Sequence, residues 1–249
     1  MRPVATLLVV LAGLLAQRAH AGCVTDGILL FPAPGAVVPP NTRFILEGAG
    51  REQQRVDALM GQELFLKGGS DVVSVKVTQK WISTMKRVAL LLEPQGELKA
   101  GQSYTLALER LLPNAKLLNG NQSEPRWVAA SAADKLPPRY QVKPSVAEGA
   151  YTQDANGVSR FLKLRTTLAE EAPAYFVVTL QRSRGSAVKQ VYPVPINGGE
   201  AMVGHDACSG GFSFEDGRSY RIALEAFDSA GNKALEKLGT IEANAPRPE

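Results

Sequence analysis

Two nine-residue segments of the chain are nearly identical, and this repeat limits the fold more than any other feature of the sequence. GQSYTLALE occupies residues 101–109 and GRSYRIALE residues 217–225, with six of nine positions matching at an offset of 116 residues. An offset of that length is close to the size of one β-sandwich domain. The repeat therefore predicts two similar domains in tandem.

Each copy of the repeat alternates apolar and polar side chains. In the first copy Tyr104, Leu106 and Leu108 share one face, and Thr105 and Glu109 share the other. The apolar face of the second copy consists of Tyr220, Ile222 and Leu224. A period of two with one apolar face is typical of a half-buried antiparallel strand. The glycine three residues before each tyrosine predicts a tight turn, because glycine adopts positive φ without steric cost.

The turn glycine followed by a tyrosine that opens a late strand resembles the tyrosine corner of immunoglobulin-like and fibronectin type III-like sandwiches. Two further segments resemble bacterial members of these families: the turn A-x-D-x-A-G-N at residues 226–232 and the proline-rich opening at residues 30–40. Paired prolines at residues 137–138 open the second unit in a similar way. The resemblance implies that Tyr104 and Tyr220 are structural tyrosine corners, whose hydroxyls return to the backbone just upstream.

The predicted fold class is all-β, with two tandem antiparallel β-sandwich domains of the immunoglobulin-like or fibronectin type III-like kind. The first domain is expected at residues 22–133 and the second at residues 134–243, followed by a loose tail at 244–249. Strands are expected at residues 27–31, 43–47, 63–67, 72–79, 87–92, 103–109, 126–129, 141–146, 160–166, 175–181, 188–192, 201–203, 211–214, 220–227 and 233–241. Short strands separated by Gly, Pro, Asn and Ser are typical of this class. Residues 51–60 are expected to form one or two helical turns.

The first 21 residues have the pattern of a secretory signal peptide. Arg2 precedes an apolar run at residues 7–15 that is too short to span a bilayer, and Ala19 and Ala21 mark the cleavage site. We therefore expect a secreted or periplasmic protein with no transmembrane helix in the mature chain. Bacterial lipoproteins carry a lipidated cysteine just after such a signal, so a lipid anchor through Cys23 is the alternative.

The chain has two cysteines, Cys23 and Cys208. Export delivers both to an oxidising compartment, where such a pair usually forms a disulfide bond. A bond between Cys23 and Cys208 would tie the N-terminal segment to the second domain. If Cys23 is acylated instead, Cys208 is expected to be a buried free thiol, because one sulfur cannot form both bonds.

Few residues suggest catalysis or metal binding. After the signal peptide the one histidine is His205, which precedes Asp206 in a glycine-rich loop three residues before Cys208. His205 and Asp206 are the candidate loop site, and we expect them to hold the loop rather than to act with Cys208 as a nucleophile and base. No second His or Cys pair offers zinc ligands, and residues 154–157 and 228–232 lack the alternating acids of a calcium loop. The sequence predicts no catalytic, metal or cofactor site.

Charge and aromatic content argue against nucleic-acid binding. Residues 22–249 contain 26 basic and 24 acidic residues, with no basic cluster interleaved with aromatics. Trp81 and Trp127 are expected to pack in the core or at an edge, and would form a sugar-stacking or partner-binding patch if exposed.

From the resemblance and the missing chemistry we expect an exported, non-catalytic binding or structural protein of the bacterial envelope or exterior. Its partner would be a protein or a polysaccharide, and not nucleic acid. A carboxylate-dependent hydrolase on a β scaffold is one alternative, because 24 acidic residues leave room for a catalytic pair. A lipoprotein accessory of an envelope assembly is the other.

Overall fold

A computed structural model describes residues 26–120, 124–154, 157–170, 172–185, 188–206 and 209–248. Almost all regular structure in these ranges is β-strand, and the strands form sheets of eight, three and four members. The predicted all-β sandwich class is therefore confirmed. The predicted signal peptide lies outside the described residues, as do Cys23 and Cys208.

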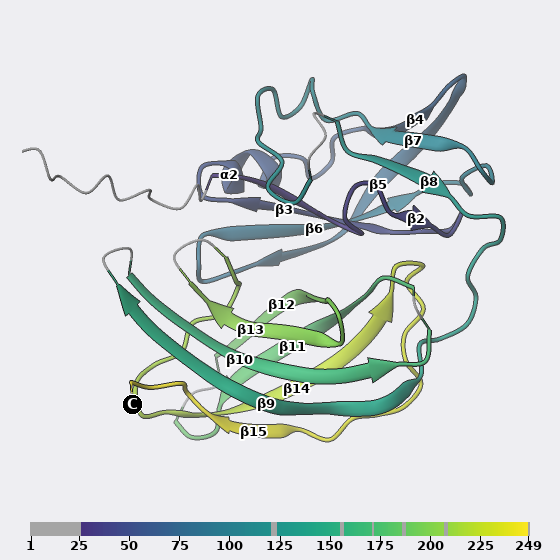
Figure 1. Cartoon of the computed structure of the whole chain (residues 1–249). Helices are drawn as coiled ribbons and strands as arrows, with labels where there is room; N and C mark the ends of the chain where they lie inside the picture. The colour runs from purple at the N-terminus through teal and green to yellow at the C-terminus, as the bar shows by residue number, and fades with distance from the viewer. Residues whose placement is uncertain are drawn as a thin grey trace, which may run out of the picture.

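The N-terminal half, residues 26–130, contains the eight-stranded sheet (Figure 1). Its elements are β1 (Gly27–Phe31), β2 (Val37–Val38), β3 (Phe44–Ala49), α2 (Glu52–Asp57), β4 (Leu64–Gly68), β5 (Asp71–Ile82), β6 (Arg87–Pro94), β7 (Ser103–Leu106) and β8 (Arg126–Ala129). The strand order is β1-β3-β6-β5-β4-β7-β8-β2, with a parallel pair between β2 and β8.

The long strand β5 joins the two layers of this half. Its first residues pair with β4 and its last residues pair with β6, with a bulge between Val77 and Gln79. A bulge bends a strand, so β5 can pass from one layer to the other. Figure 1 shows β4 and β7 above β3 and β6. The apolar side chains between the layers form one hydrophobic cluster, with Tyr104 and Trp127 among its largest members.

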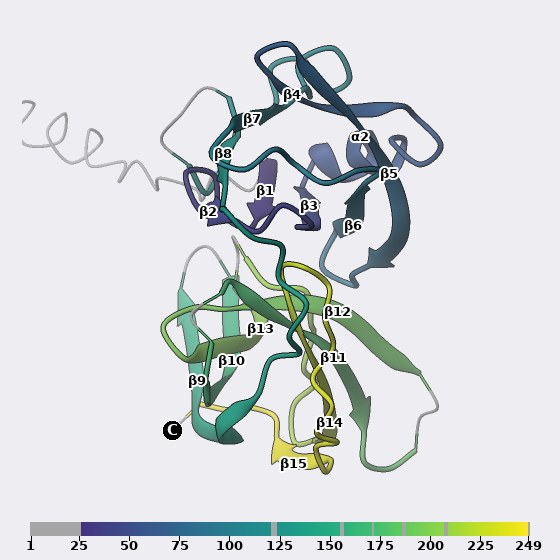
Figure 2. The ribbon, with the colours of Figure 1, turned by 90° about the vertical axis from the view of Figure 1, so that its right-hand side faces the viewer.

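The C-terminal half, residues 140–248, is a sandwich of two sheets (Figures 1 and 2). One sheet has the order β13-β10-β9 and the other β12-β11-β14-β15. The strands are β9 (Tyr140–Asp154), β10 (Gly157–Leu168), β11 (Ala174–Arg182), β12 (Lys189–Ile196), β13 (Glu200–His205), β14 (Ser219–Asp228) and β15 (Ile241–Asn244). Buried and exposed residues alternate along β14, as period two requires.

The two repeated tyrosines lie in separate hydrophobic clusters. Tyr104 is on β7 and Tyr220 is on β14, and both are buried. The hydroxyl of Tyr104 accepts the backbone N–H of Lys99 at 2.9 Å, and that of Tyr220 accepts the backbone N–H of Glu215 at 2.9 Å. In both cases the donor lies five residues upstream, which is the contact of a tyrosine corner. The domain boundary between residues 133 and 134 stays a prediction.

Three segments differ from the expectations. Residues 211–214 form no strand, because side chains of neighbouring elements bind their backbone. The last strand covers Ile241–Asn244 rather than residues 233–241. Residues 245–246, placed in the loose tail, are buried, and the N–H of Ala245 donates to the carbonyl of Arg218 at 2.8 Å.

The two halves share an apolar junction. Four buried residues of the N-terminal half belong to the hydrophobic cluster of the C-terminal half: Ile45, Trp81, Ala89 and Leu91. Phe31 also meets Tyr175 edge to face, with ring centres 5.3 Å apart. Both tryptophans are therefore buried as predicted, Trp127 inside the N-terminal half and Trp81 between the halves.

Candidate functional site

The turn that follows β14 is held closed by Asp228. Its carboxylate accepts the backbone N–H of Asn232 and the side-chain amide of the same residue, both at 2.9 Å. Burial raises the pKa of Asp228 above its ordinary value, and the hydrogen bonds from Asn232 oppose that shift. Gly231 completes the turn with a φ of 85°. These contacts fix the backbone of residues 229–231.

This turn packs against the start of β3 in the other half. The carbonyl of Ser229 accepts the backbone N–H of Arg43 at 2.6 Å and the hydroxyl of Thr42 at 3.2 Å. The side chain of Arg43 covers Gly231 so closely that a Cβ there would lie 2.6 Å from Nε. A side chain at this position would push the Arg43 guanidinium aside, and the positive φ of Gly231 separately favours glycine.

The linker between the halves is tied to the same point. The amide of Asn41 donates to the carbonyl of Asp134 at 2.7 Å, and the N–H of Asp134 donates back to the side-chain oxygen of Asn41 at 2.9 Å. The amide of Asn232 also donates to the Asp134 carbonyl, at 3.2 Å. Residues 41–43, Asp134 and residues 228–232 thus form one bonded unit, which we call the junction latch.

A recess of about 310 Å³ opens beside the junction latch. It is lined by residues 41–43, residues 93–97 and Ala230, so both halves contribute to it. Arg43 donates to Glu93 at 3.0 Å, and each of these side chains is 34% exposed. Glu97 is exposed and has no ion-pair partner among the described residues. The recess therefore contains one immobilised guanidinium–carboxylate pair and one further carboxylate, and its lining residues include no aromatic side chain.

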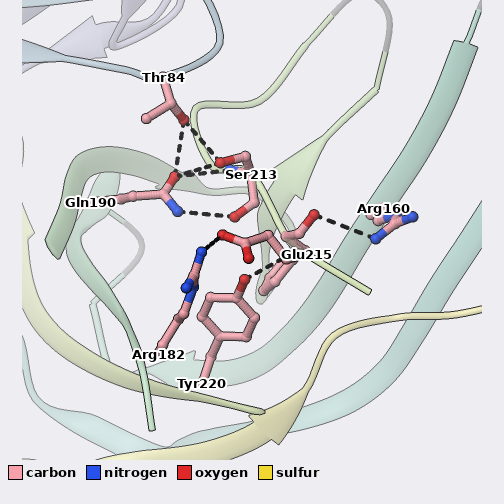
Figure 3. Close-up of polar contacts among 8 residues, drawn as sticks. Thr84, Arg160, Arg182, Gln190, Ser213, Glu215 and Tyr220 are labelled. Carbon is pink, nitrogen blue, oxygen red and sulfur yellow. Dashed lines mark hydrogen bonds and ion pairs between the residues drawn. The ribbon is translucent and has the colours of Figure 1, made fainter. Parts of the chain in front are cut away.

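A second set of polar contacts joins the halves at the loop after β13 (Figure 3). The hydroxyl of Ser83 donates to the carbonyl of Gly211 at 2.8 Å. Thr84 lies 3.0 Å from the side-chain oxygen of Gln190 and 3.2 Å from that of Ser213. Gln190 and Ser213 also form two hydrogen bonds of 2.9 Å between side chain and backbone. These contacts bind the turn between β5 and β6 to the C-terminal half.

Two arginines, Arg160 and Arg182, also bind this loop (Figure 3). Arg160 donates to the carbonyl of Phe214 at 3.3 Å and pairs with Asp216 at 2.6 Å. Arg182 pairs with Glu215, whose backbone N–H binds the Tyr220 hydroxyl. Each charged group in the network is thus bonded to the loop, so we interpret the network as structural.

A buried ion pair lies within the junction. Glu47 pairs with Arg87, and both side chains are largely buried. Burial raises the pKa of Glu47, and the attraction of Arg87 opposes the shift. Tyr192 of the other half faces this pair, and burial raises its pKa well above the ordinary value, with the charge of Glu47 adding to the effect. The pair therefore belongs to the contact between halves and lies away from the recess lining.

The candidate residues His205 and Asp206 lie at the end of β13, outside the recess lining. Nδ1 of His205 is 2.9 Å from the carbonyl oxygen of Phe212, and the hydroxyl of Ser209 donates to Asp206 at 3.0 Å. In the described ranges no group of three or more His, Cys, Asp or Glu side chains is placed to hold a metal ion. The disulfide between Cys23 and Cys208 stays a prediction, because both residues lie outside the described ones.

Sequence reasoning did not find Arg43, Glu93 or Glu97. They come from two separate segments of the chain, residues 41–43 and 93–97, that no spacing rule connects. One signal was available in the turn at residues 226–232, where a glycine follows a buried Asp. The resemblance of this turn to those of other repeats does not reveal its contact with the other half.

No protein-family model matches the chain, and no curated protein matches it in sequence. Among solved structures, it is similar to pullulanase type I from Bacillus subtilis str. 168 complexed with maltose, at 9% identity and a TM-score of 0.25 over 88% of this chain and 24% of that one. It is also similar to a pullulanase from Anoxybacillus sp. LM18-11 complexed with maltotriose, at 8% identity and a TM-score of 0.24 over 78% of this chain and 24% of that one. The chain spans about a quarter of the length of these enzymes, and TM-scores this low carry no argument about its function.

Within the described ranges, no helix has the length and apolar character needed to cross a bilayer.

Proposed function

We propose that the chain is an exported, non-catalytic binding protein of the bacterial envelope or exterior. Its partner is a protein that places a basic side chain in the recess beside the junction latch. In this proposal the N-terminal half is immunoglobulin-like and the C-terminal half is fibronectin type III-like. The N-terminal half supplies the charged residues of this site, and Ala230 of the C-terminal half completes its lining.

The recess at the junction is the observation that carries the proposal. Binding sites occur preferentially where two domains meet and are usually preformed. Arg43 neutralises Glu93, so Glu97 leaves the recess with one excess negative charge at neutral pH. A Lys or Arg side chain is complementary to that charge. A polysaccharide fits less well, because sugar rings stack on aromatic side chains and the lining contains none.

The strand pairing supports the proposed classes of the two halves. Sheets of three and four strands, with a tyrosine corner at the start of β14, agree with a fibronectin type III-like sandwich. The Tyr104 corner at β7 is the corresponding support for an immunoglobulin-like N-terminal half. Proteins of both kinds commonly use rigid sandwiches to present loops to partners.

Site-specific photo-cross-linking tests the proposal. A photoreactive residue at Gln95, which is exposed at the recess, is expected to give a protein adduct with an extract of the producing organism's envelope. The same residue at Lys67, exposed on β4 and outside the lining, is the matched control. Adding Glu97→Arg should remove the Gln95 adduct, because it reverses the charge. Adducts of equal yield at both positions, or no effect of Glu97→Arg, would show that the recess is not the binding site.

A carboxylate-dependent hydrolase remains the second candidate, because the recess contains both Glu93 and Glu97. Hydrolysis of an envelope polymer that is abolished by Glu93→Gln and by Glu97→Gln would favour it over binding alone. A lipoprotein accessory is distinguished by mass spectrometry of the mature N-terminus. An acylated Cys23 would establish the anchor, and an unmodified residue 22 would establish a free protein.

A further inference from the structure

The strand β9 has one edge that pairs with nothing in the described ranges. β9 is the outer member of the sheet β13-β10-β9, and its partner in that sheet is β10. From Glu148 to Asp154 the pairing with β10 is regular, without a register shift. From Glu148 to Gln153, extended backbone therefore presents alternate N–H and C=O groups to solvent on the outer side.

Two other sheet edges, those of β1 and β12, offer fewer free donors. Along β1, the N–H of Ile28 donates to Lys116 and the N–H of Leu118 donates back to Ile28, both at 2.8 Å. β12 carries Pro193 and Pro195 at alternate positions while it pairs with β11 over its whole length. Because proline has no N–H, the free side of β12 lacks donors there. β9 has no proline after residue 144, so residues 148–153 keep their donors.

Charges on the outer face of this sheet alternate from strand to strand and end at the open edge. Glu200 on β13 lies 3.8 Å from Lys163 on β10, and Lys163 lies 3.1 Å from Glu148 on β9. Glu148 is 58% exposed and has a cation on its β10 side. A further strand beside β9 would place a side chain directly across from Glu148. Opposite charges across strands stabilise a pair, so that side chain is expected to be Lys or Arg.

The neighbouring position selects a different side chain. Gly149 pairs with Leu162 and so lies on the inner face of the sheet. Its missing side chain leaves a space bordered by Leu162 and Pro246, which would lie 3.6 Å and 3.8 Å from an added Cβ. A glycine at a sheet edge favours a large apolar side chain on the adjacent strand, which covers the exposed surface.

We propose that residues 148–153 of β9 bind an extended segment of another polypeptide as an added strand. The segment carries Lys or Arg opposite Glu148 and an apolar residue opposite Gly149. Main-chain hydrogen bonds supply affinity in this mode, and alternate side chains supply specificity. The site is separate from the recess and does not depend on what the recess binds.

The probe for this site is a capped, fluorescently labelled peptide, Lys-Val-Thr-Val-Thr-Phe-Lys, which places its last Lys and Phe opposite Glu148 and Gly149 in an antiparallel pair. Fluorescence anisotropy is expected to show binding to the mature protein. Amide exchange is expected to slow along residues 148–153. Methylation of alternate backbone nitrogens of the peptide, with side chains unchanged, should abolish binding because it removes the donors.

Charge exchange tests the specificity. Glu148→Lys should weaken the Lys peptide about three- to tenfold, since a favourable cross-strand pair becomes a repulsive one. The same variant should strengthen a peptide with Glu in place of the last Lys. Glu63→Lys, an equal charge change at an exposed residue of the other half, is the control and should leave both affinities unchanged.

Protection of another strand, tight binding of the N-methylated peptide, or equal effects of Glu148→Lys and Glu63→Lys would each overturn the proposal. Concentration-dependent dimerisation through β9 in the absence of peptide would also overturn it, because the edge would then be occupied by a second copy.

Discussion

Replacing Trp81 by alanine is expected to uncouple the two halves. Trp81 extends from β5 into the cluster of the C-terminal half and is 4% exposed. Truncation of a buried Trp to Ala typically costs about 3–5 kcal/mol. The indole N–H has no hydrogen-bond partner in the described part of the chain, and removing a buried unpaired donor returns about 1–3 kcal/mol. The net loss should therefore be about 2 kcal/mol at the junction, within a range of about 0–4 kcal/mol.

The assay uses the fact that the chain has two tryptophans. In Trp81→Ala, and in the control Trp81→Phe, the remaining Trp127 reports on the core of the N-terminal half alone. Urea unfolding is followed by Trp127 fluorescence and by far-ultraviolet circular dichroism, which reports on both halves. For Trp81→Phe the two transitions should coincide. For Trp81→Ala they should separate, with at least one midpoint lowered by about 1 M.

The control keeps most of the apolar contact and removes the unpaired N–H, so its stability should stay close to that of the wild type. If Trp81→Ala and Trp81→Phe unfold with superimposable curves by both probes, the junction contributes no coupling. The reasoning from burial at Trp81 would then be refuted.

Three further predictions concern the corners, the latch and pH. Tyr104→Phe and Tyr220→Phe should each lower the free energy of unfolding by about 1 kcal/mol, because the backbone N–H of Lys99 or Glu215 loses its acceptor in a partly buried contact. Tyr151→Phe, at a hydroxyl bonded to an exposed side chain, should change it by less than about 0.5 kcal/mol in the same urea assay, and equal losses would contradict the corner contacts. Gly231→Ala should destabilise the protein more than Gly217→Ala, because both residues have positive φ but only a Cβ at residue 231 would meet Arg43. Urea midpoints of the two variants test this, and equal midpoints would show that the contact between Gly231 and Arg43 adds nothing to stability. Hydrogen bonds from Lys99 and Tyr104 lower the pKa of Asp71, so its contribution to stability is present above the unfolded-state pKa and is lost as pH falls through the folded-state pKa. The difference in unfolding free energy between wild type and Asp71→Asn should therefore shrink on acidification from about pH 6 to about pH 2, and a constant difference would show that Asp71 is not stabilised in this way.

Local pattern was sufficient to predict most of the strands. The alternation of Tyr220, Ile222 and Leu224 placed β14, because period two is a property of neighbouring residues and needs no knowledge of the fold. Residues 211–214 look like a short strand by composition, yet Arg160 and Gln190 bind their backbone instead. Leu235 shows the opposite limit. It lies in the segment 233–241, expected to be a strand, but it is 84% exposed, and that segment pairs as a strand only at its ends, at Lys233 and Ile241. Strand pairing is decided by distant partners, which a local pattern does not contain.

The junction shows why the candidate site could not be predicted in the same way. Trp81, Ala89 and Leu91 lie on β5 and β6, which also contribute side chains to the core of the N-terminal half. These strands therefore carry buried apolar residues on both faces. A second apolar face on an antiparallel strand indicates that something covers it, but it does not say what. Glycine is favoured at position 231 by the positive φ of this residue and by Arg43, which lies above it and comes 188 residues earlier in the chain. The recess is the space left where these surfaces meet, so its shape follows from the contact between the halves. A change that shifts this contact, such as Gly231→Ala, should therefore alter binding at the recess even though residue 231 is absent from its lining.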